Sequence, residues 1–260
     1  MTKNQIKNIQ KLKQKKYRLL EKKFIIEGSH LIEECIDSSI FKELVDFIII
    51  QKNFKNTGLI EKLNRYKYKL EYVEPKTFNK ISDTENPEGI IGVINMPGEI
   101  REENLKDDVI ICLDCINDPG NLGTILRTCW WFGIKRVIIS KDSSDIYNPK
   151  VLRASQGAIF NISIKTDINL NEYLEYLYKE NYLIYLTTLN TENLLTKEKF
   201  SGDKKYVIVF GNEVKGISKT LLGNNNYKTI KINSFTNCES LNVSVAAGII
   251  LSYLKLSILN

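Results

Sequence analysis

The chain has 260 residues, of which 43% are hydrophobic and 26% charged, so its composition excludes a disordered or fibrous chain and is typical of a globular protein. It has no apolar run of about 18 residues and no apolar signal region behind its basic N-terminus, so we expect no membrane span, a cytoplasmic location and reduced cysteines. The formal net charge of +6 suits a nucleic-acid partner but does not identify one. Lysine and arginine dominate residues 1–23, as either a solvated face or a phosphate-binding surface.

The first part of the chain alternates between helical and strand patterns. In chain order we expect a helix at 4–22, a strand at 24–28, a helix at 29–36, a strand at 44–50, a helix at 59–68, a strand at 69–73, a turn at 74–76 and a strand at 90–94. This alternation indicates a small α/β domain over residues 1–97. Proline, glycine and many charges then indicate a linker over residues 98–107.

The second part of the chain, residues 108–260, contains strands that are apolar along their whole length. They are predicted at 109–113, 136–140, 162–165, 182–186, 206–210 and 229–232. Helices are predicted between them, from the turn at 118–121 to residue 131, at 149–157, at 170–180 and from residue 240 onward. Strands that are apolar on both faces and separated by helices are typical of a parallel sheet covered on both sides, so we predict an α/β fold.

Three polar stretches follow predicted strands, at residues 118–127, 211–218 and 237–242. Because the carboxyl ends of parallel strands meet at one edge of a sheet, we expect these stretches to line one crevice. Ser240 occupies the position expected of an N-cap, and Asn242 falls in the first turn of the helix that follows. These small polar groups are either a plain helix cap or part of a ligand site.

The residues present disfavour a phosphate-binding loop, a metal site and a histidine-based catalytic site in the second domain. Residues 211–218 have glycines at the spacing of a phosphate-binding loop, but Ile217 stands where that loop needs lysine. Cys112 and Cys115 form a C-x-x-C pair inside a predicted strand without a second Cys or His pair, so we expect no metal. His30 is the single histidine and lies in the first domain, so the second domain cannot build a Ser-His-Asp arrangement.

Several motifs occur together in an informative order. They are D-P-G-N-L-G-T-I-L-R-T from residue 118, V-F-G-N-E-V-K-G-I-S from residue 209 and E-S-L-N-V-S-V-A-A-G from residue 239. Residues 145–157, with Y-N-P-K and R-A-S, and the N-terminal stretches F-I-I-E-G-S-H-L-I-E-E and N-P-E-G-I-I-G-V add to the pattern. With these motifs the sequence resembles the SpoU (TrmH) family of RNA 2′-O-methyltransferases over nearly its whole length.

The resemblance implies a SPOUT-type catalytic domain with a C-terminal trefoil knot, preceded by an L30e-like RNA substrate-binding domain. It also implies a homodimer that uses S-adenosyl-L-methionine. Carried over by position, cofactor contacts fall on Gly211, Ile232 and Leu241. Catalytic or RNA-ordering roles fall on Asn121, Arg127, Glu213, Ser240 and Asn242. The chain departs from the family at Asn233 and Ser234, where Pro and Met usually follow the isoleucine of the cofactor loop.

The resemblance predicts methyl transfer to a ribose 2′-hydroxyl of structured RNA, which needs positioning rather than a metal. The extra N-terminal domain favours 23S ribosomal RNA. A tRNA substrate and a catalytically silent RNA-binding factor of ribosome assembly are the alternatives. The family's counterpart of Arg127 is proposed as a base, but a guanidinium scarcely deprotonates in proteins. We therefore expect Arg127 chiefly to grip a phosphate and to stabilise negative charge on the reacting oxygen.

Overall fold

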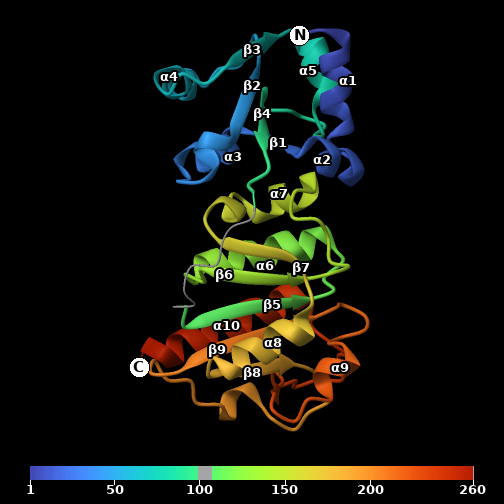
Figure 1. Ribbon diagram of the computed structural model, residues 1–260, viewed down its shortest axis with the longest axis vertical. Helices are drawn as coiled ribbons and strands as arrows, with labels where there is room; N and C mark the ends of the chain where they lie inside the picture. Colours follow the sequence, from blue (N-terminus) through green and yellow to red (C-terminus); the bar gives the residue numbers. More distant parts are fainter. Residues whose placement is uncertain (99–106, 260) are drawn as a thin grey trace. The chain divides into compact units, whose positions relative to one another are not determined.

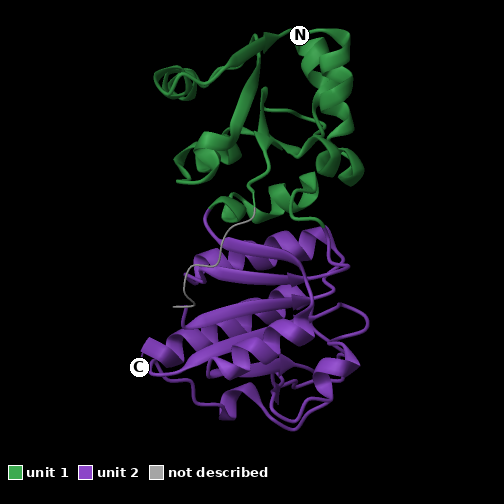
Figure 2. Cartoon of the chain, viewed as in Figure 1, with its two compact units in different colours: residues 1–102, 145–160 green, residues 103–144, 161–260 purple. Residues whose placement is uncertain are grey.

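The computed structural model describes residues 1–98 and 107–259, which belong to two compact units. Unit 1 comprises residues 1–102 and 145–160, and unit 2 comprises residues 103–144 and 161–260 (Figure 2). The linker predicted at 98–107 lies outside the described residues except at its two ends. No helix in the described part of the chain is long and apolar enough to cross a membrane.

Unit 1 is built on a four-stranded mixed sheet in the order β1-β4-β2-β3 (Figure 1). Its elements are α1 (Lys3–Lys11), α2 (Lys15–Glu21), β1 (Lys23–Glu27), α3 (Ser29–Asp37), the 3₁₀ helix η1 (Phe41–Leu44), β2 (Val45–Gln51), α4 (Thr57–Arg65), β3 (Leu70–Val73), α5 (Pro75–Ile81), β4 (Ile90–Asn95), α7 (Pro149–Ser155) and the 3₁₀ helix η2 (Ala158–Phe160). Strand β4 pairs antiparallel with β1 and β2, whereas β2 and β3 are parallel. Apolar side chains of α1 and α5 pack against one face of this sheet.

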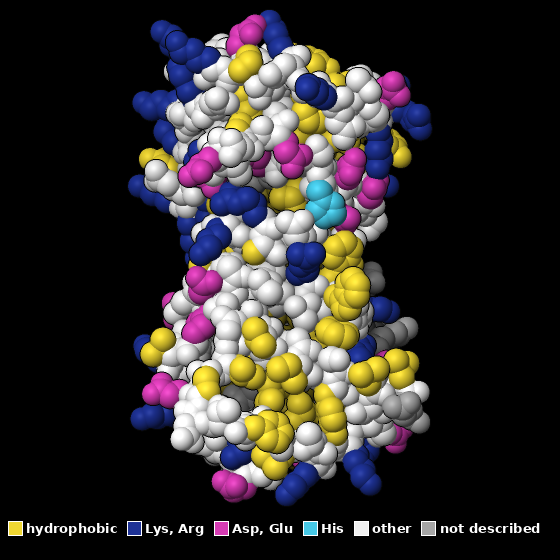
Figure 3. All heavy atoms as spheres, turned by 180° about the vertical axis from the view of Figure 1, so that it is seen from behind, with side chains coloured by type: hydrophobic (Ala, Val, Ile, Leu, Met, Phe, Trp, Pro, Cys, Tyr) yellow, Lys and Arg dark blue, Asp and Glu magenta, His cyan; other side chains and the backbone are white. Residues whose placement is uncertain are grey.

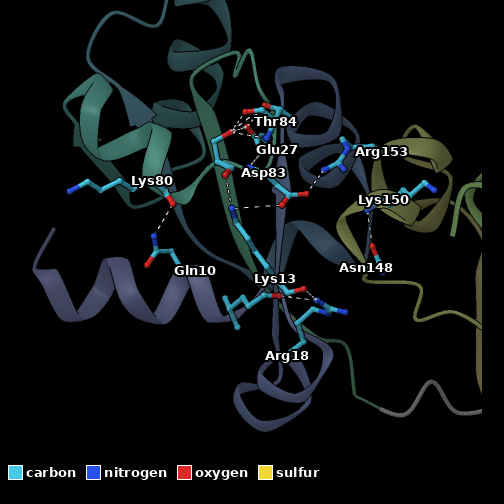
Figure 4. Close-up of polar contacts among 12 residues, drawn as sticks. Gln10, Lys13, Arg18, Glu27, Lys80, Asp83, Thr84, Asn148, Lys150 and Arg153 are labelled. Carbon is cyan, nitrogen blue, oxygen red and sulfur yellow. Dashed lines mark hydrogen bonds and ion pairs between the residues drawn. The ribbon is translucent and has the colours of Figure 1, made fainter.

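The single helix predicted over residues 4–22 is wrong, because the chain breaks between α1 and α2. Nη1 of Arg18 donates to the carbonyl oxygens of Leu12, at 2.9 Å, and Lys13, at 2.8 Å (Figure 4). The same buried guanidinium pairs with Asp145. The side chain thus satisfies carbonyl groups that the interrupted helix leaves without an intrahelical partner.

Residues 145–160 follow β6 along the chain but pack within unit 1. The ring of Tyr147 stacks on that of Phe24, with centroids 4.3 Å apart. Nη1 of Arg153, on α7, donates to Oδ2 of Asp83 at 2.8 Å (Figure 4). The sequence places this segment in the second predicted domain, whereas its side chains complete the core and the polar surface of the first unit.

Unit 2 is built on a six-stranded sheet in the order β10-β8-β9-β5-β6-β7, in which all neighbours are parallel. Its elements are β5 (Val109–Asp114), α6 (Pro119–Trp131), β6 (Arg136–Ser140), β7 (Ser163–Ile168), α8 (Leu170–Lys179), β8 (Tyr182–Thr187), the 3₁₀ helix η3 (Leu195–Lys197), β9 (Lys205–Gly211), α9 (Lys219–Leu222), β10 (Lys228–Ile230) and α10 (Val243–Leu259). Every residue of β5 is buried, because α8 covers one face of the sheet and α6 and α10 cover the other (Figure 1). The predicted α/β class and parallel sheet are confirmed.

Two short helices were not predicted. The turn predicted at 74–76 opens α5, in which Pro75 occupies the first turn, where its missing N–H costs no hydrogen bond. Helix α9 follows Ser218 and contributes the buried side chain of Leu221 to the core beneath α8. Both helices are too short for a clear periodic pattern of apolar residues.

Candidate active site

The carboxyl ends of β5 and β9 lie side by side in unit 2, where Asp114 pairs in register with Gly211. Helix α6 follows β5, a turn at 212–217 follows β9, and a loop at 231–242 leads from β10 to α10. Loops at this edge of a parallel sheet form the usual ligand crevice of α/β proteins. The structure therefore places the three polar stretches singled out in the sequence after strands of one sheet.

Two hydrogen bonds join Asn121, Glu213 and Asn242, one residue from each of these stretches. Nδ2 of Asn121 donates to Oε1 of Glu213 at 3.0 Å, and Nδ2 of Asn242 donates to Oδ1 of Asn121 at 2.9 Å. Both ends of the Asn121 amide are used, so its orientation is fixed. We call these three residues the polar chain. Its side chains remain accessible to solvent and hence to a ligand.

The local sequence of α6 sets the position of Asn121. Asp118 is the N-cap of the helix, and its Oδ1 accepts the backbone N–H of Asn121 at 2.8 Å. Pro119 occupies the first helical turn, where its fixed φ favours the helix. The run Asp-Pro-Gly-Asn thus starts the helix and places the amide of Asn121 beside the ends of the neighbouring strands.

Asn242, and not Ser240, caps helix α10. Oδ1 of Asn242 accepts the backbone N–H of Ser244 at 2.9 Å, and the carbonyl oxygen of Asn242 accepts that of Ala246 at 2.9 Å. These are the bonds of an N-cap, so the predicted cap at Ser240 is wrong and Asn242 lies before the first turn rather than in it. One side chain therefore both starts α10 and completes the polar chain.

Gly211 ends β9 where the backbone folds back against it. A Cβ atom at this position would lie 2.4 Å from backbone atoms of Gly216 and Ile217, so no other residue fits without moving the turn. Oδ1 of Asn212 accepts the N–H groups of Val214 and Lys215, and its Nδ2 donates to the carbonyl oxygen of Cys115 at 2.8 Å. Asn212 holds the turn that presents Glu213. Asn212 was not among the predicted site residues, although its place between Gly211 and Glu213 was a usable signal.

Arg127 lies further along α6, with an exposed side chain. Its guanidinium makes no hydrogen bond or ion pair with any residue that the structure describes. Ser240 is also exposed, and its hydroxyl is not joined to the polar chain. The structure thus brings three of the five predicted catalytic residues together and leaves the side chains of Arg127 and Ser240 available for other partners.

Two of the three predicted cofactor residues share a backbone feature, whereas Gly211 pairs with Asp114 in the sheet. Ile232 and Leu241 have N–H and C=O groups that make no hydrogen bond within the described residues. The side chain of Leu241 is 49% exposed, and that of Ile232 is half-buried. At the departure from the family pattern, Oδ1 of Asn233 accepts a hydrogen bond from Oγ1 of Thr196 at 3.2 Å, which ties the loop to η3. Backbone groups without partners and an exposed apolar side chain suit an adenosine group.

The thiols beside β5 are not activated. Cys112 is fully buried, and this burial raises the pKa of its thiol above the ordinary value. Burial also raises the pKa of Cys115, which follows the strand with a positive φ of 56°. Within residues 1–98 and 107–259 no group of three or more His, Cys, Asp or Glu side chains is placed to hold a metal ion. The carboxylate of Glu213 is the ionisable group of the polar chain.

Comparison with known families gives two matches along the chain. Residues 108–252 match the model of the SpoU rRNA methylase family. Residues 3–92 match the MRM3-like substrate-binding domain. The resemblance stated from the sequence motifs is confirmed.

Individual proteins match over the whole length of the chain. The 23S rRNA (guanosine(2553)-2′-O)-methyltransferase RlmP of Bacillus subtilis is 32% identical, and the match covers 97% of each chain. A solved structure of an RNA 2′-O ribose methyltransferase superposes with a TM-score of 0.81 and 26% identity, covering 98% of this chain and 96% of that one. The AdoMet-bound rRNA methyltransferase of Sinorhizobium meliloti has a TM-score of 0.85 and 23% identity, covering 100% and 97%, and shares the fold.

Proposed function

Since the chain belongs to the SpoU rRNA methylase family, we propose that it transfers the methyl group of S-adenosyl-L-methionine to a ribose 2′-hydroxyl of 23S ribosomal RNA. The polar chain carries this proposal. Its hydrogen bonds join three motifs that are 92 and 121 residues apart in sequence at the carboxyl edge of a parallel sheet. Such an arrangement can aim a hydroxyl group toward a reacting centre with little further ordering.

S-adenosyl-L-methionine supplies an activated methyl group on a positively charged sulfur when it is bound. Gly211, Ile232 and Leu241 would hold it, since the latter two offer unpaired backbone groups and Leu241 offers apolar surface. Gly211 keeps the turn of residues 212–217 folded close against the end of β9. The AdoMet-bound neighbour of the same fold supports this choice of cofactor.

Transfer of the methyl group to the ribose oxygen would leave the cofactor as a neutral thioether, and the hydroxyl proton would pass to solvent, which reaches the polar chain. The exposed guanidinium of Arg127 would bind a phosphate next to the target ribose and stabilise negative charge on the oxygen. A guanidinium presents a rigid fork of donors to a phosphate and scarcely deprotonates, so it is a better clamp than a base. The amides of Asn121 and Asn242 would orient the ribose, and Glu213 fixes the first of them.

A large-subunit ribosomal RNA is the favoured substrate for two reasons. The relative from Bacillus subtilis, which matches over nearly its whole length, is named for a guanosine of 23S rRNA. In unit 1 the lysines of α1 and α2 lie mostly exposed, so that this unit can supply a sequence-independent grip on RNA.

Unit 2 would work as a homodimer with a knotted C-terminal segment. Helix α10 exposes Val245, at 50%, Ile249, at 40%, and Leu256, at 60%, along one side. Trp131 on α6, the helix that packs against α10, is 84% exposed. Figure 3 shows hydrophobic side chains gathered on one face of this unit. A second copy of the chain would cover this patch, and the molecular mass in solution, measured by light scattering, tests the dimer.

The decisive experiment uses purified protein, labelled S-adenosyl-L-methionine and total RNA from a strain that lacks the gene. The RNA is separated by size and the labelled ribose is mapped. We expect label at one 2′-oxygen of large ribosomal RNA. This label should be absent with Arg127→Ala and present with the control Lys179→Ala, whose side chain is exposed. Label in tRNA would overturn the substrate. Cofactor binding without label on naked RNA or on ribosomal precursor particles would favour the silent assembly factor.

A further inference from the structure

Unit 1 contains a solvent-open cavity of about 330 Å³ at the carboxyl end of β2. Its walls combine one aromatic ring, three amides, one cation, one carboxylate and a proline: Phe54, Gln51, Asn53, Asn56, Lys55, Glu88 and Pro87. The volume lies at the lower end of the range for small-molecule pockets, about 300–1,000 Å³. None of these residues belongs to the polar chain or to the basic helices α1 and α2.

The backbone around the cavity is fixed by a close approach of two segments. Gly89 has a φ of +97°, and a Cβ there would lie 3.2 Å from Gln51 and 3.4 Å from the ring of Phe54. The N–H of Gln51 donates to the carbonyl oxygen of Gly89 at 2.8 Å, and that of Phe54 donates to Gln51 at 2.9 Å. The glycine therefore lets both side chains close against the start of β4, so that the wall is formed before any ligand arrives.

The polar groups of this wall have hydrogen-bonding capacity to spare. The side-chain amides of Gln51 and Asn53 make no hydrogen bond with any described residue, and Lys55 has no ion pair there. Asn56 uses its Oδ1 to cap α4, where it accepts the N–H of Leu59 at 3.0 Å, and keeps its two amide donors. Unused donors and acceptors beside an aromatic ring can form hydrogen bonds to the edge of a planar heterocycle that stacks on the ring.

Glu88, like Asn56, is already held by one hydrogen bond. Its Oε2 accepts the backbone N–H of Ser29 at 2.9 Å, at the start of α3. The carboxylate keeps free lone pairs toward the cavity, and an ionised carboxylate can only accept hydrogen bonds. It therefore favours a heterocycle that carries an amino group and disfavours one that presents only carbonyl oxygens.

We propose that this cavity receives one unpaired, amino-bearing nucleotide of the substrate RNA, an inference that rests on the proposed function. The base stacks on Phe54, its edge meets the amides of Gln51 and Asn53 and the carboxylate of Glu88, and Lys55 contacts a phosphate. Unpaired bases of structured RNA are bound in this manner, by stacking and by hydrogen bonds to their edges. The cavity thereby adds base recognition to the charge-based grip of the lysines in α1 and α2.

The test compares kcat and KM of the full-length enzyme for its substrate RNA. Phe54→Ala should raise KM about tenfold with kcat nearly unchanged, since the loss of one stacked base weakens binding by that order. Phe54→Tyr should restore KM, and Tyr72→Ala, an exposed aromatic residue outside the cavity, should not change it. Unchanged KM in Phe54→Ala, with an active wild type, would overturn the pocket while leaving the proposed function intact. A wild type that methylates no RNA would instead overturn the proposed function.

A second measurement separates RNA from free nucleotides and tests the base preference. Replacing each unpaired purine or cytosine of the substrate by uridine, one at a time, should raise KM at a single position for the wild type and leave Phe54→Ala unaffected. A uniform response at all positions would overturn the pocket. Titration with AMP, GMP, CMP and UMP should show binding far weaker than that of RNA. Submicromolar binding of one of them, lost in Phe54→Ala, would make the cavity a free-nucleotide site instead.

Discussion

The polar chain of unit 2 and the cavity of unit 1 use their polar side chains in opposite ways. In unit 2, Asn121, Glu213 and Asn242 satisfy one another and leave little freedom. In unit 1, Gln51 and Asn53 line a cavity with amides that have no partner among the described residues. A preformed network suits chemistry, where small errors in orientation cost rate, whereas unused donors and acceptors suit recognition, where the ligand completes the bonds. Variants that disrupt the network should therefore lower kcat, whereas variants that disrupt the cavity should raise KM.

The largest expected effect comes from the buried pair of Arg18 and Asp145 in unit 1, which lies outside the cavity. Arg18→Met removes a buried guanidinium that serves Asp145 and the carbonyl oxygens of Leu12 and Lys13. We expect the free energy of unfolding to fall by about 3–5 kcal/mol, because buried acceptors lose their donor. Urea denaturation measures this loss. Lys15→Met, at an exposed site of the same helix, is the control, and a loss as small as that of the control would contradict the role.

Arg127 in unit 2 differs from Arg18, since its side chain is exposed and has no partner among the described residues. Its removal should therefore affect catalysis and not stability. Arg127→Ala should lower kcat by about 10²–10³-fold, the usual cost of removing a donor to a developing oxyanion. The free energy of unfolding should change by less than about 0.5 kcal/mol, because an exposed group is lost. Arg127→Lys should recover part of the rate. Near-full turnover of Arg127→Ala at neutral pH would exclude both the clamp and the base roles.

The sequence predicted the framework of unit 2 better than that of unit 1. Continuous apolar runs such as 109–113 and 206–210, separated by helical patterns, are typical of a parallel sheet covered on both faces, and the two runs pair in that sheet. The motifs also contained the three polar residues that gather at its edge, but they did not indicate that Arg127 and Ser240 would stay outside this group. The break near Leu12 was not predictable, because it depends on a contact of Arg18 with Asp145, 127 residues away. Local periodicity carries no information about such a pair.

Two predictions were wrong for related reasons: the N-cap at Ser240 and the assignment of residues 145–160 to the second domain. Ser240 and Asn242 are both good N-caps by residue type, and the structure uses Asn242, whose side chain also bonds to Asn121. A helix was predicted at residues 149–157, but the local sequence does not say which of the two cores that helix joins. The contact of Tyr147 with Phe24 assigns the segment to unit 1. In both cases a long-range partner decided between local solutions of similar quality.

Gly211 offers a steric test of the arrangement in unit 2. Gly211→Ala places a methyl group 2.4 Å from the backbone of Gly216 and Ile217, so the turn that carries Glu213 must shift. We expect a loss of about 1–3 kcal/mol in stability and weaker cofactor binding, measured by thermal unfolding and calorimetric titration. In the control Gly202→Ala, the nearest atom lies at an ordinary 3.5 Å. Equal behaviour of the two variants would show that the close approach is not required.

The smallest effect separates the two tasks of Asn242. Asn242→Ala should cost about 1 kcal/mol, the usual value of an N-cap, whereas Ser240→Ala should leave stability nearly unchanged. Asn242→Asp keeps the oxygen that accepts the N–H of Ser244 but loses the donor to Asn121. It should therefore retain the stability of the wild type, measured by urea denaturation, while kcat falls, since Asn121 is no longer fixed at both ends. If the Asp variant keeps full kcat, the polar chain supports the helix and not the reaction.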